Sequence, residues 1–471
     1  MKRISAWGLR ISIISFAFLH FVTVFWKVDF LILLLQLSGL SLFIFSIGYF
    51  SLSKFKLPLT IFIAALIVLF FANHSLLDGI FHGVILMRSM IGLLIIVPLI
   101  SWVLREEPYI EDVMSLFHRF IDTSKRFYLS LVFFTQIIAY FLLFGSIQMM
   151  YQLVQIILKE QTSEIWENFK GTALLRGFAL STLWVISIPS FIFAVDTLGA
   201  SLWISILQGF GIAVVGSLMA VVFMTIKEKR SNVTFTPVLQ DNLERLIENA
   251  SPKDVQKKKV VEFILLFVSV FGTIFFIHAI FNVNLLLTIP LVIIGWIIAF
   301  FLLKRRVHKL GADAKAHFKT GMLNQSYQLN IMVTVGILIY ALEQTSFATV
   351  VVNGFNAVEG LIPFINPLFL LPFIVIILGF VGLGPLTVMV LVAGILASLN
   401  LPYPPELIVL SVTSGSVISI LLSPVVLPVI ALSASNGLSM FTNGFKFNWK
   451  FSLAFYILVQ IYLQTMVHFW Y

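Results

Sequence analysis

Long apolar stretches recur along almost the whole chain and are separated by short polar connections. Apolar runs of about 18 or more residues are typical of membrane spans, and hydrocarbon favours helices because they satisfy their own backbone hydrogen bonds. A transmembrane barrel would show short alternating strands instead. The pattern therefore predicts an all-α, polytopic membrane protein. The predicted apolar segments are 11–26, 30–50, 58–72, 84–104, 128–158, 178–195, 202–226, 260–280, 284–303, 327–342, 364–400, 405–432 and 451–467.

The composition agrees with this pattern. Of 471 residues, 60% are hydrophobic and only 11% are charged, and the mean hydropathy is +1.05. A soluble protein of this length would need a more polar surface. The net charge of +9 is explained by Lys and Arg retained in cytoplasmic loops rather than by binding to nucleic acid. We expect an integral, multi-pass protein of a bacterial plasma membrane.

One long polar stretch divides the chain. Residues 227–259 carry eight basic and five acidic residues, and they separate an N-terminal membrane half, 1–226, from a C-terminal half, 260–471. The basic excess places this linker in the cytoplasm. Residues 105–140 and 305–340 share an order of features: arginine after an apolar span, a polar stretch, then a long apolar segment ending in tyrosine. The order indicates two related halves, as in many secondary transporters, although chance similarity between hydrophobic stretches is an alternative.

The polar parts of these two matches, 106–126 and 307–325, are predicted to be helices lying along the membrane surface. The apolar parts, 127–158 and 327–358, are longer than the roughly 20 residues that one span needs, and both contain polar residues near their middle. We expect each to form a re-entrant hairpin, which enters and leaves the membrane on one side. A tilted helix that runs into an interfacial turn would also account for the length.

Polar residues inside the apolar segments are the candidate site. Ionisable groups in a membrane are costly and face a cavity or a partner, and proline within a hydroxyl-rich span favours a broken helix that can line a site. We expect breaks near Ser187–Pro189 in 176–197 and near Ser414–Pro424 in 408–432. Kinked helices with serines bonded back to the backbone are the alternative, and Glu343 could be purely structural. The predicted substrate- or ion-binding residues are Arg176, Ser181, Thr182, Ser187, Pro189, Asp196, Glu343, Gln344, Thr345, Ser346, Thr413, Ser414, Ser416, Ser423 and Pro424.

Within this set, Glu343 is the predicted coupling residue, because a carboxylate in low dielectric can exchange a proton or bind Na⁺. Arg176 is the predicted partner of an anionic group, because guanidinium binds carboxylate or phosphate at two points. Glycines at 379, 382 and 384 before Pro385 predict another interrupted or closely packed helix.

On these features the chain resembles the ion transporter superfamily of secondary anion and organic-acid carriers. The resemblance rests on segments 127–158 and 327–358, on "GLGPLTVM" and on "SGSVISILLSP". It implies two inverted repeats, re-entrant hairpins and unwound helices around the substrate. The chain lacks the Ser-Asn-Thr signatures of the family's dicarboxylate carriers, so specificity for carboxylates does not carry over.

The expected function is secondary active transport of a small anionic solute coupled to Na⁺ or H⁺. The alternative is a polytopic membrane enzyme or flippase that handles a lipid-linked substrate. The sequence has no H-E-x-x-H, Walker or G-x-S-x-G motif, so we expect no enzyme, no catalytic residues, no cofactor and no metal beyond a transported Na⁺. The expected partners are the lipid bilayer, the solute and the coupling ion. The sequence leaves a homodimer open, and nucleic acid is not expected.

Overall fold

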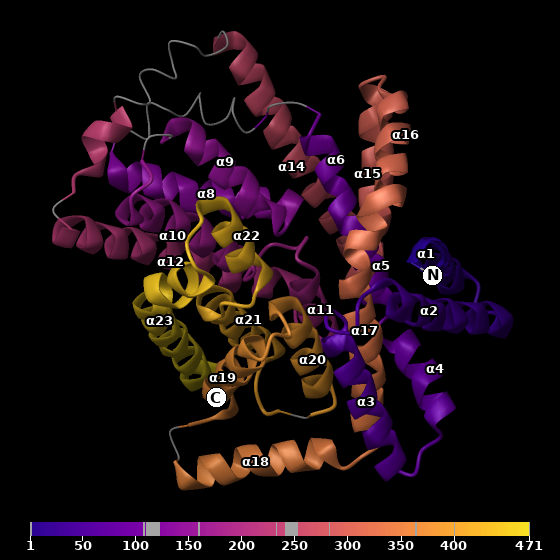
Figure 1. Cartoon of the computed structure of the whole chain (residues 1–471). Coiled ribbons are helices and arrows are strands. Elements are labelled where there is room, and N and C mark those ends of the chain that lie inside the picture. Colours follow the sequence, from indigo (N-terminus) through magenta and orange to yellow (C-terminus); the bar gives the residue numbers. More distant parts are fainter. Residues whose placement is uncertain are drawn as a thin grey trace.

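The computed structural model describes residues 2–106, 109, 123–158, 161–231, 233–240, 253–281, 283–362, 365–399 and 401–470. Every regular element in these ranges is a helix (Figure 1). Nine of the helices in the described ranges are long and apolar enough to cross a membrane, and a bent pair, Leu76–Leu86 with Arg88–Leu104, could form one more. The prediction of an all-α, multi-pass membrane protein is confirmed at this level.

The first part of the chain contains α1 (Lys2–Phe25), α2 (Asp29–Tyr49), α3 (Lys56–Phe71), α4 (Leu76–Leu86), α5 (Arg88–Ile96), η1 (Val97–Ile100), α6 (Ser101–Leu104), α8 (Ser124–Leu142), α9 (Gly145–Ile157), α10 (Glu164–Ser181), α11 (Pro189–Thr197) and α12 (Leu202–Ser231). The second part contains α14 (Lys253–Phe281), α15 (Leu285–Leu303), α16 (Val307–Ala316), η3 (His317–Gly321), α17 (Met322–Glu343), α18 (Phe347–Leu361), α19 (Pro367–Phe380), α20 (Pro385–Ala397), α21 (Pro405–Leu422), α22 (Leu427–Asn436), η4 (Thr442–Lys446) and α23 (Phe447–Trp470).

Local sequence signals set the ends of many helices. The side chains of Asn284 and Asn366 accept hydrogen bonds from the first turns of α15 and α19, as N-cap residues do. Proline occupies the first turn of α11, α20 and α21, where its missing N–H costs nothing. Gly437 ends α22 in the left-handed conformation, at φ 72°, which glycine adopts without strain.

Two helices form the centre of the structure. In α10 every residue from Trp166 to Ser181 is buried, and in α21 every residue from Leu407 to Leu421 is buried. These helices contact each other, and each has its own main neighbour: α8 packs on α10, and α19 packs on α21. Further contacts join α9 to α22 and α11 to α20. The helices of residues 124–231 therefore pack against those of residues 367–470 at several places.

Both expected helix breaks are present. After α10 ends at Ser181, residues 182–188 form turns before Pro189 starts α11. After α21 ends at Leu422, the chain is irregular until α22 starts at Leu427. The break in the second helix lies only at its Ser423–Pro424 end, because residues 411–416 are regular helix. The glycine-rich break is also confirmed: α19 and α20 are separated by a turn in which Gly382 and Gly384 have positive φ.

The two segments predicted to form hairpins have different structures. Segment 127–158 turns at Leu143, and the resulting helices α8 and α9 pack on each other. Segment 327–358 breaks after α17, but α18 runs roughly at right angles to α17, below and to the left of its lower end in Figure 1, and Phe355 is its only buried residue. Neither segment is confirmed as re-entrant, and the relation between the two predicted halves is not confirmed.

The predicted surface helix at 307–325 needs correction. Residues 307–343 form one continuous helical stretch of 37 residues through α16, η3 and α17, so the polar part extends the apolar part instead of lying apart from it. At 1.5 Å per residue the stretch is about 55 Å long, which exceeds the roughly 30 Å hydrocarbon core. The other predicted surface helix, 106–126, and the middle of the linker, 241–252, lie largely outside the described residues.

Candidate functional site

The interrupted helices meet at a cavity of about 250 Å³. The turn between α8 and α9 lines it, together with the break between α10 and α11, the first residues of α20, the start of α17 and the middle of α21. The polar and break-forming residues in its lining are Gly145, Thr182, Pro189, Ser190, Gln325, Gln328, Pro385 and Ser416. Thr182, Pro189 and Ser416, which come from distant parts of the predicted set, are thus brought together.

Three helices begin at this cavity. Gly145 starts α9, Pro189 starts α11 and Pro385 starts α20. The first N–H groups of a helix have no partner within it, and the peptide dipoles place a partial positive charge at that end. Pro189 and Pro385 favour two of these starts, because each lacks the N–H with which a preceding helix would continue. The peptide dipoles at these three ends therefore favour negative charge in the cavity.

Several side chains in the cavity are free to bind a ligand. Within the described part of the chain, the side chains of Ser190, Ser416, Gln325 and Gln328 make no hydrogen bond. The Gln325 side-chain oxygen is also shielded from solvent. Thr182 instead bonds back to the Ala179 carbonyl at 2.7 Å. Since buried polar groups are usually paired, a cluster of unpaired donors and acceptors around a cavity is suited to a polar solute.

Other predicted hydroxyl groups are used within the fold. Ser181 donates to the Phe178 carbonyl, Thr413 to the Val409 carbonyl and Ser414 to the Ser411 carbonyl. For these residues the alternative interpretation, serines and threonines bonded back to their own helix, describes the structure.

Two more hydroxyl groups secure the breaks themselves. Ser187 donates to the Tyr140 carbonyl on α8, and Ser423 donates to the Gly379 carbonyl on α19 at 3.1 Å. Each therefore ties a helix break to the neighbour on which its helix packs. Pro424 lies in the second break and is half-buried.

Arg176 and Asp196 do not line the cavity. Arg176 is buried on α10, where its Nε donates to Asn448 Oδ1 at 3.0 Å and its Nη1 donates to the Tyr128 hydroxyl at 3.1 Å. Asp196 is half-buried at the other end of α11 and accepts from Asn284 Nδ2 at 2.9 Å. The two residues that frame the broken helix thus anchor it to different neighbours.

The Glu343 cluster lies elsewhere. Glu343, Gln344 and Ser346 are exposed, and Thr345 is half-buried and bonded to the Leu342 carbonyl. Glu343 is 15 residues beyond Gln328, which corresponds to about 22 Å along a helix. The structure therefore does not bring this cluster to the cavity.

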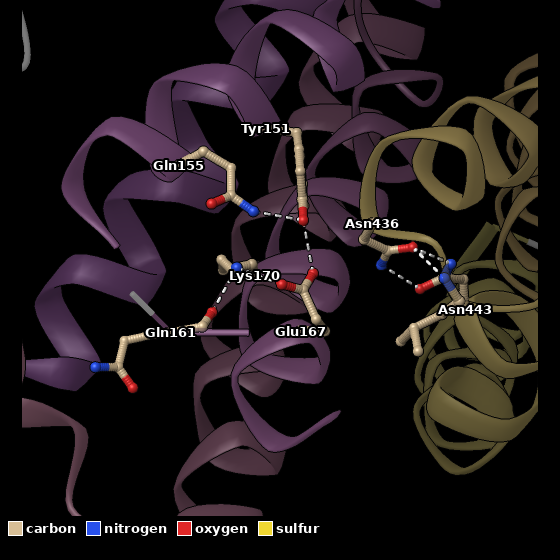
Figure 2. A network of polar contacts seen from close by, with 8 residues as sticks. Tyr151, Gln155, Gln161, Glu167, Lys170, Asn436 and Asn443 are labelled. Carbon is tan, nitrogen blue, oxygen red and sulfur yellow. Dashed lines mark hydrogen bonds and ion pairs between the residues drawn. The ribbon is translucent and has the colours of Figure 1, made fainter. Parts of the chain in front are cut away.

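Sequence analysis missed two buried charges, Glu167 and Lys170, which form an ion pair on α10. Figure 2 shows their surroundings: the Tyr151 hydroxyl donates to Glu167 at 2.9 Å, and Lys170 donates to the Gln161 carbonyl at 2.9 Å. Gln155 Nε2 in turn donates to the Tyr151 hydroxyl at 2.7 Å. The available signal was the i, i+3 spacing of opposite charges in "EIWENFKG", which places them on one helix face.

A second polar cluster joins α10 to the C-terminal helices. Asn436 and Asn443 exchange two hydrogen bonds of 2.9 Å between their amides, as Figure 2 shows. Asn448 donates to the Asn443 carbonyl at 2.9 Å while accepting from Arg176. Arg176 is therefore part of the connection between α22 and α23.

Neither a metal site in the described part of the chain nor a known relative indicates a function. Among the described residues, no group of three or more His, Asp or Glu could hold a metal ion. No protein-family model matches the chain, and no curated protein is significantly similar to it.

Proposed function

We propose that this protein is a secondary carrier of a small anionic solute, and that the solute binds in the cavity at the interrupted helices. The observation that carries the proposal is the convergence of three helix starts and four unpaired polar side chains on one cavity. In secondary transporters, broken helices present their N-terminal ends to anionic groups of the substrate. Coupling to Na⁺ or H⁺ remains part of the proposal, without an assigned residue.

The solute class follows from charge and size. Helix N-termini favour anions, and amide and hydroxyl groups supply further hydrogen bonds. The described lining of the cavity contains no Asp or Glu that would repel an anion. Its volume of about 250 Å³ is below the range of about 300–1,000 Å³ that is usual for drug-sized ligands. This supports a small solute over the bulky lipid-linked substrate of an enzyme or flippase.

The arrangement of helices also supports a carrier. We interpret α8–α12 and α19–α23 as two structural repeats, since each contains a packed helix pair, a fully buried helix that breaks, and a long final helix. In this interpretation the counterpart of segment 127–158 is α19–α20, and not 327–358. The helices α19 and α20, with 14 and 13 residues, are each about 20 Å long, too short to cross the hydrocarbon core alone.

Two serines on α21 provide a direct test. The Ser416 hydroxyl lines the cavity without a partner, whereas the Ser414 hydroxyl bonds to the Ser411 carbonyl. Ser416→Ala and Ser414→Ala make the same chemical change two residues apart. The purified variants would be compared in proteoliposomes, with a panel of small anions and imposed Na⁺ and H⁺ gradients.

We expect gradient-driven uptake of at least one anion by the unmodified protein. Ser416→Ala should raise the apparent KM for this anion about two- to twelvefold, since a lost hydrogen bond is worth about 0.5–1.5 kcal/mol. Ser414→Ala should leave the KM unchanged. If Ser416→Ala and Ser414→Ala change the KM equally, the cavity is not the solute-binding site. Turnover of a lipid-linked substrate without any gradient would mean that the protein is an enzyme or flippase and not a carrier.

A further inference from the structure

A second, larger cavity lies beside α10 and shares no lining residue with the site described above. Its volume is about 590 Å³, and it is bounded by α10, the end of α12, and the segment from η4 into α23. Five basic residues line it: Arg176, Lys227, Arg230, Lys446 and Lys450. Its described lining includes no Asp or Glu. Aromatic side chains, among them those of Phe223, Phe447 and Trp449, form much of the remaining wall.

The nearby carboxylates neutralise little of this charge. Glu164 pairs with Lys446 at 2.7 Å and its charge also acts on Lys227, but the Glu164 and Lys446 side chains are both more than half exposed. Glu228 follows Lys227 in sequence but accepts from Ser124 Oγ at 3.1 Å and from the Phe235 backbone at 3.0 Å. Within the described part of the chain, Lys227, Arg230 and Lys450 have no ion-pair partner. An exposed rim pair such as Lys446–Glu164 contributes little, so the cavity keeps a large positive charge.

The inner wall adds two observations. Arg176 is buried, and the hydrogen-bond acceptors around it are neutral: the Asn448 amide, the Tyr128 hydroxyl and backbone carbonyls. The Phe451 ring lies 4.4 Å from its guanidinium carbon. The amide nitrogen of Asn168, which is 7% exposed and lines the same cavity, has no hydrogen-bond partner among the described residues. A buried cation without a counter-ion and an unpaired buried donor are both costly, and an anionic ligand with several oxygens would offset both costs.

We propose that this cavity is a binding site for a phosphate group, separate from the transport site. A phosphate offers several acceptor oxygens, which matches the number and dispersion of the cationic donors. The aromatic and apolar walls suit the organic part of a phosphate ester. The phosphate could belong to the headgroup of an anionic lipid or to a water-soluble ester. Basic residues at the ends of spans are typical of headgroup contacts.

The test uses the full chain in detergent and measures binding by native mass spectrometry and by the shift in thermal unfolding midpoint. The probes are dioctanoyl phosphatidylglycerol, dioctanoyl phosphatidylcholine and glycerol 3-phosphate. The site variant is Lys227→Gln with Arg230→Gln; both residues are exposed on α12, so folding is not at stake. The matched control is Lys229→Gln with Lys258→Gln, which removes the same charge from exposed positions outside the cavity lining.

We expect phosphatidylglycerol or glycerol 3-phosphate to bind and raise the unfolding midpoint, and the site variant to weaken that binding at least tenfold. A tenfold loss of affinity corresponds to about 1.4 kcal/mol of binding free energy. The loss of two hydrogen bonds to charged groups would cost more than this. The control variant should bind within twofold of the unmodified chain. Binding of the anionic lipid alone would identify a headgroup site, and binding of glycerol 3-phosphate, with or without the lipid, would identify a site that accepts soluble esters.

Three results would overturn the proposal. The first is that neither anionic probe binds. The second is that the site and control variants lose affinity equally, which would mean non-specific attraction to positive charge. The third is that phosphatidylcholine binds as well as phosphatidylglycerol and equally in both variants, which would mean that acyl chains alone determine binding.

Discussion

The buried ion pair on α10 allows a quantitative prediction. Lys170 has a side chain that is 0% exposed, and Glu167 is 5% exposed. Lys170→Met removes the ammonium group but keeps the length and apolar volume of the side chain. Among the described residues, the hydrogen bond from the Tyr151 hydroxyl is then the one contact that still stabilises the charge of the Glu167 carboxylate. The change should therefore leave a buried charge without compensation.

Breaking a buried pair from one side costs about 3–5 kcal/mol. An unfolding entropy of about 2 cal/mol/K per residue amounts to about 1 kcal/mol/K for a chain of this length. The thermal midpoint of Lys170→Met should therefore fall by about 3–5 °C. The double change Glu167→Gln with Lys170→Met removes both charges, and its midpoint should recover most of this loss, since a pair replaced on both sides is often close to neutral.

The assay is thermal unfolding of the purified full-length chain in detergent, followed by tryptophan fluorescence and by loss of the monodisperse peak in size-exclusion chromatography. Lys229→Met, at an exposed position of α12, is the control for loss of a positive charge and should shift the midpoint by less than about 1 °C. A midpoint of Lys170→Met within 1 °C of the unmodified chain would refute the reasoning. A double variant less stable than Lys170→Met would do the same.

Two further predictions concern packing and pH. Gly209 on α12 approaches the α10–α11 break so closely that an added Cβ would overlap a backbone carbonyl, whereas Gly211 faces open space; Gly209→Ala should lower folded yield and thermal midpoint, and Gly211→Ala should do neither. Burial raises the pKa of Glu106, but hydrogen bonds and charge from Lys309 and Arg306 outweigh this and hold it below its usual value. The stabilisation from Glu106 should therefore be complete above the unfolded pKa of about 4.3 and be lost as pH falls through the lower folded pKa. The midpoint difference between the unmodified chain and Glu106→Gln should accordingly be constant from pH 7 to about pH 5 and close below about pH 4; a difference that grows on acidification would contradict this assignment.

Helix breaks could be predicted from sequence because their causes are local. Pro189, Pro424 and Pro385 each remove a backbone donor, and Gly382 and Gly384 adopt positive φ without strain. Their positions in the sequence therefore indicated the breaks, but proline alone does not determine one, because Pro290 and Pro372 lie inside α15 and α19. Which breaks face one another depends on how distant helices pack, and an apolar sequence carries little information about that packing.

The missed charges have a related cause. A hydropathy pattern averages over a window, and Glu164, Glu167 and Lys170 make the start of α10 look like a polar loop. In the structure this stretch is helix, and every residue from Trp166 onward is buried. The charges are tolerated because partners on α9 and in the preceding connection satisfy them. Those partners are tertiary contacts, which the window could not include. Glu343 illustrates the same limit, since an apolar window does not show that the residue lies at an exposed helix end.

The position of α10 links the two proposed sites. Arg176 lies in the wall of the phosphate cavity, and Thr182, six residues further along, lies in the wall of the transport cavity, a separation of about 9 Å along the helix axis. Between these points α10 is buried on all sides, and Arg176 holds it to the α22–α23 connection through Asn448. A displacement of α10 that altered the break at Thr182 would therefore also alter the wall that carries Arg176. Phosphate bound against Arg176 can change the solute affinity only to the extent that it binds two positions of α10 with different affinity.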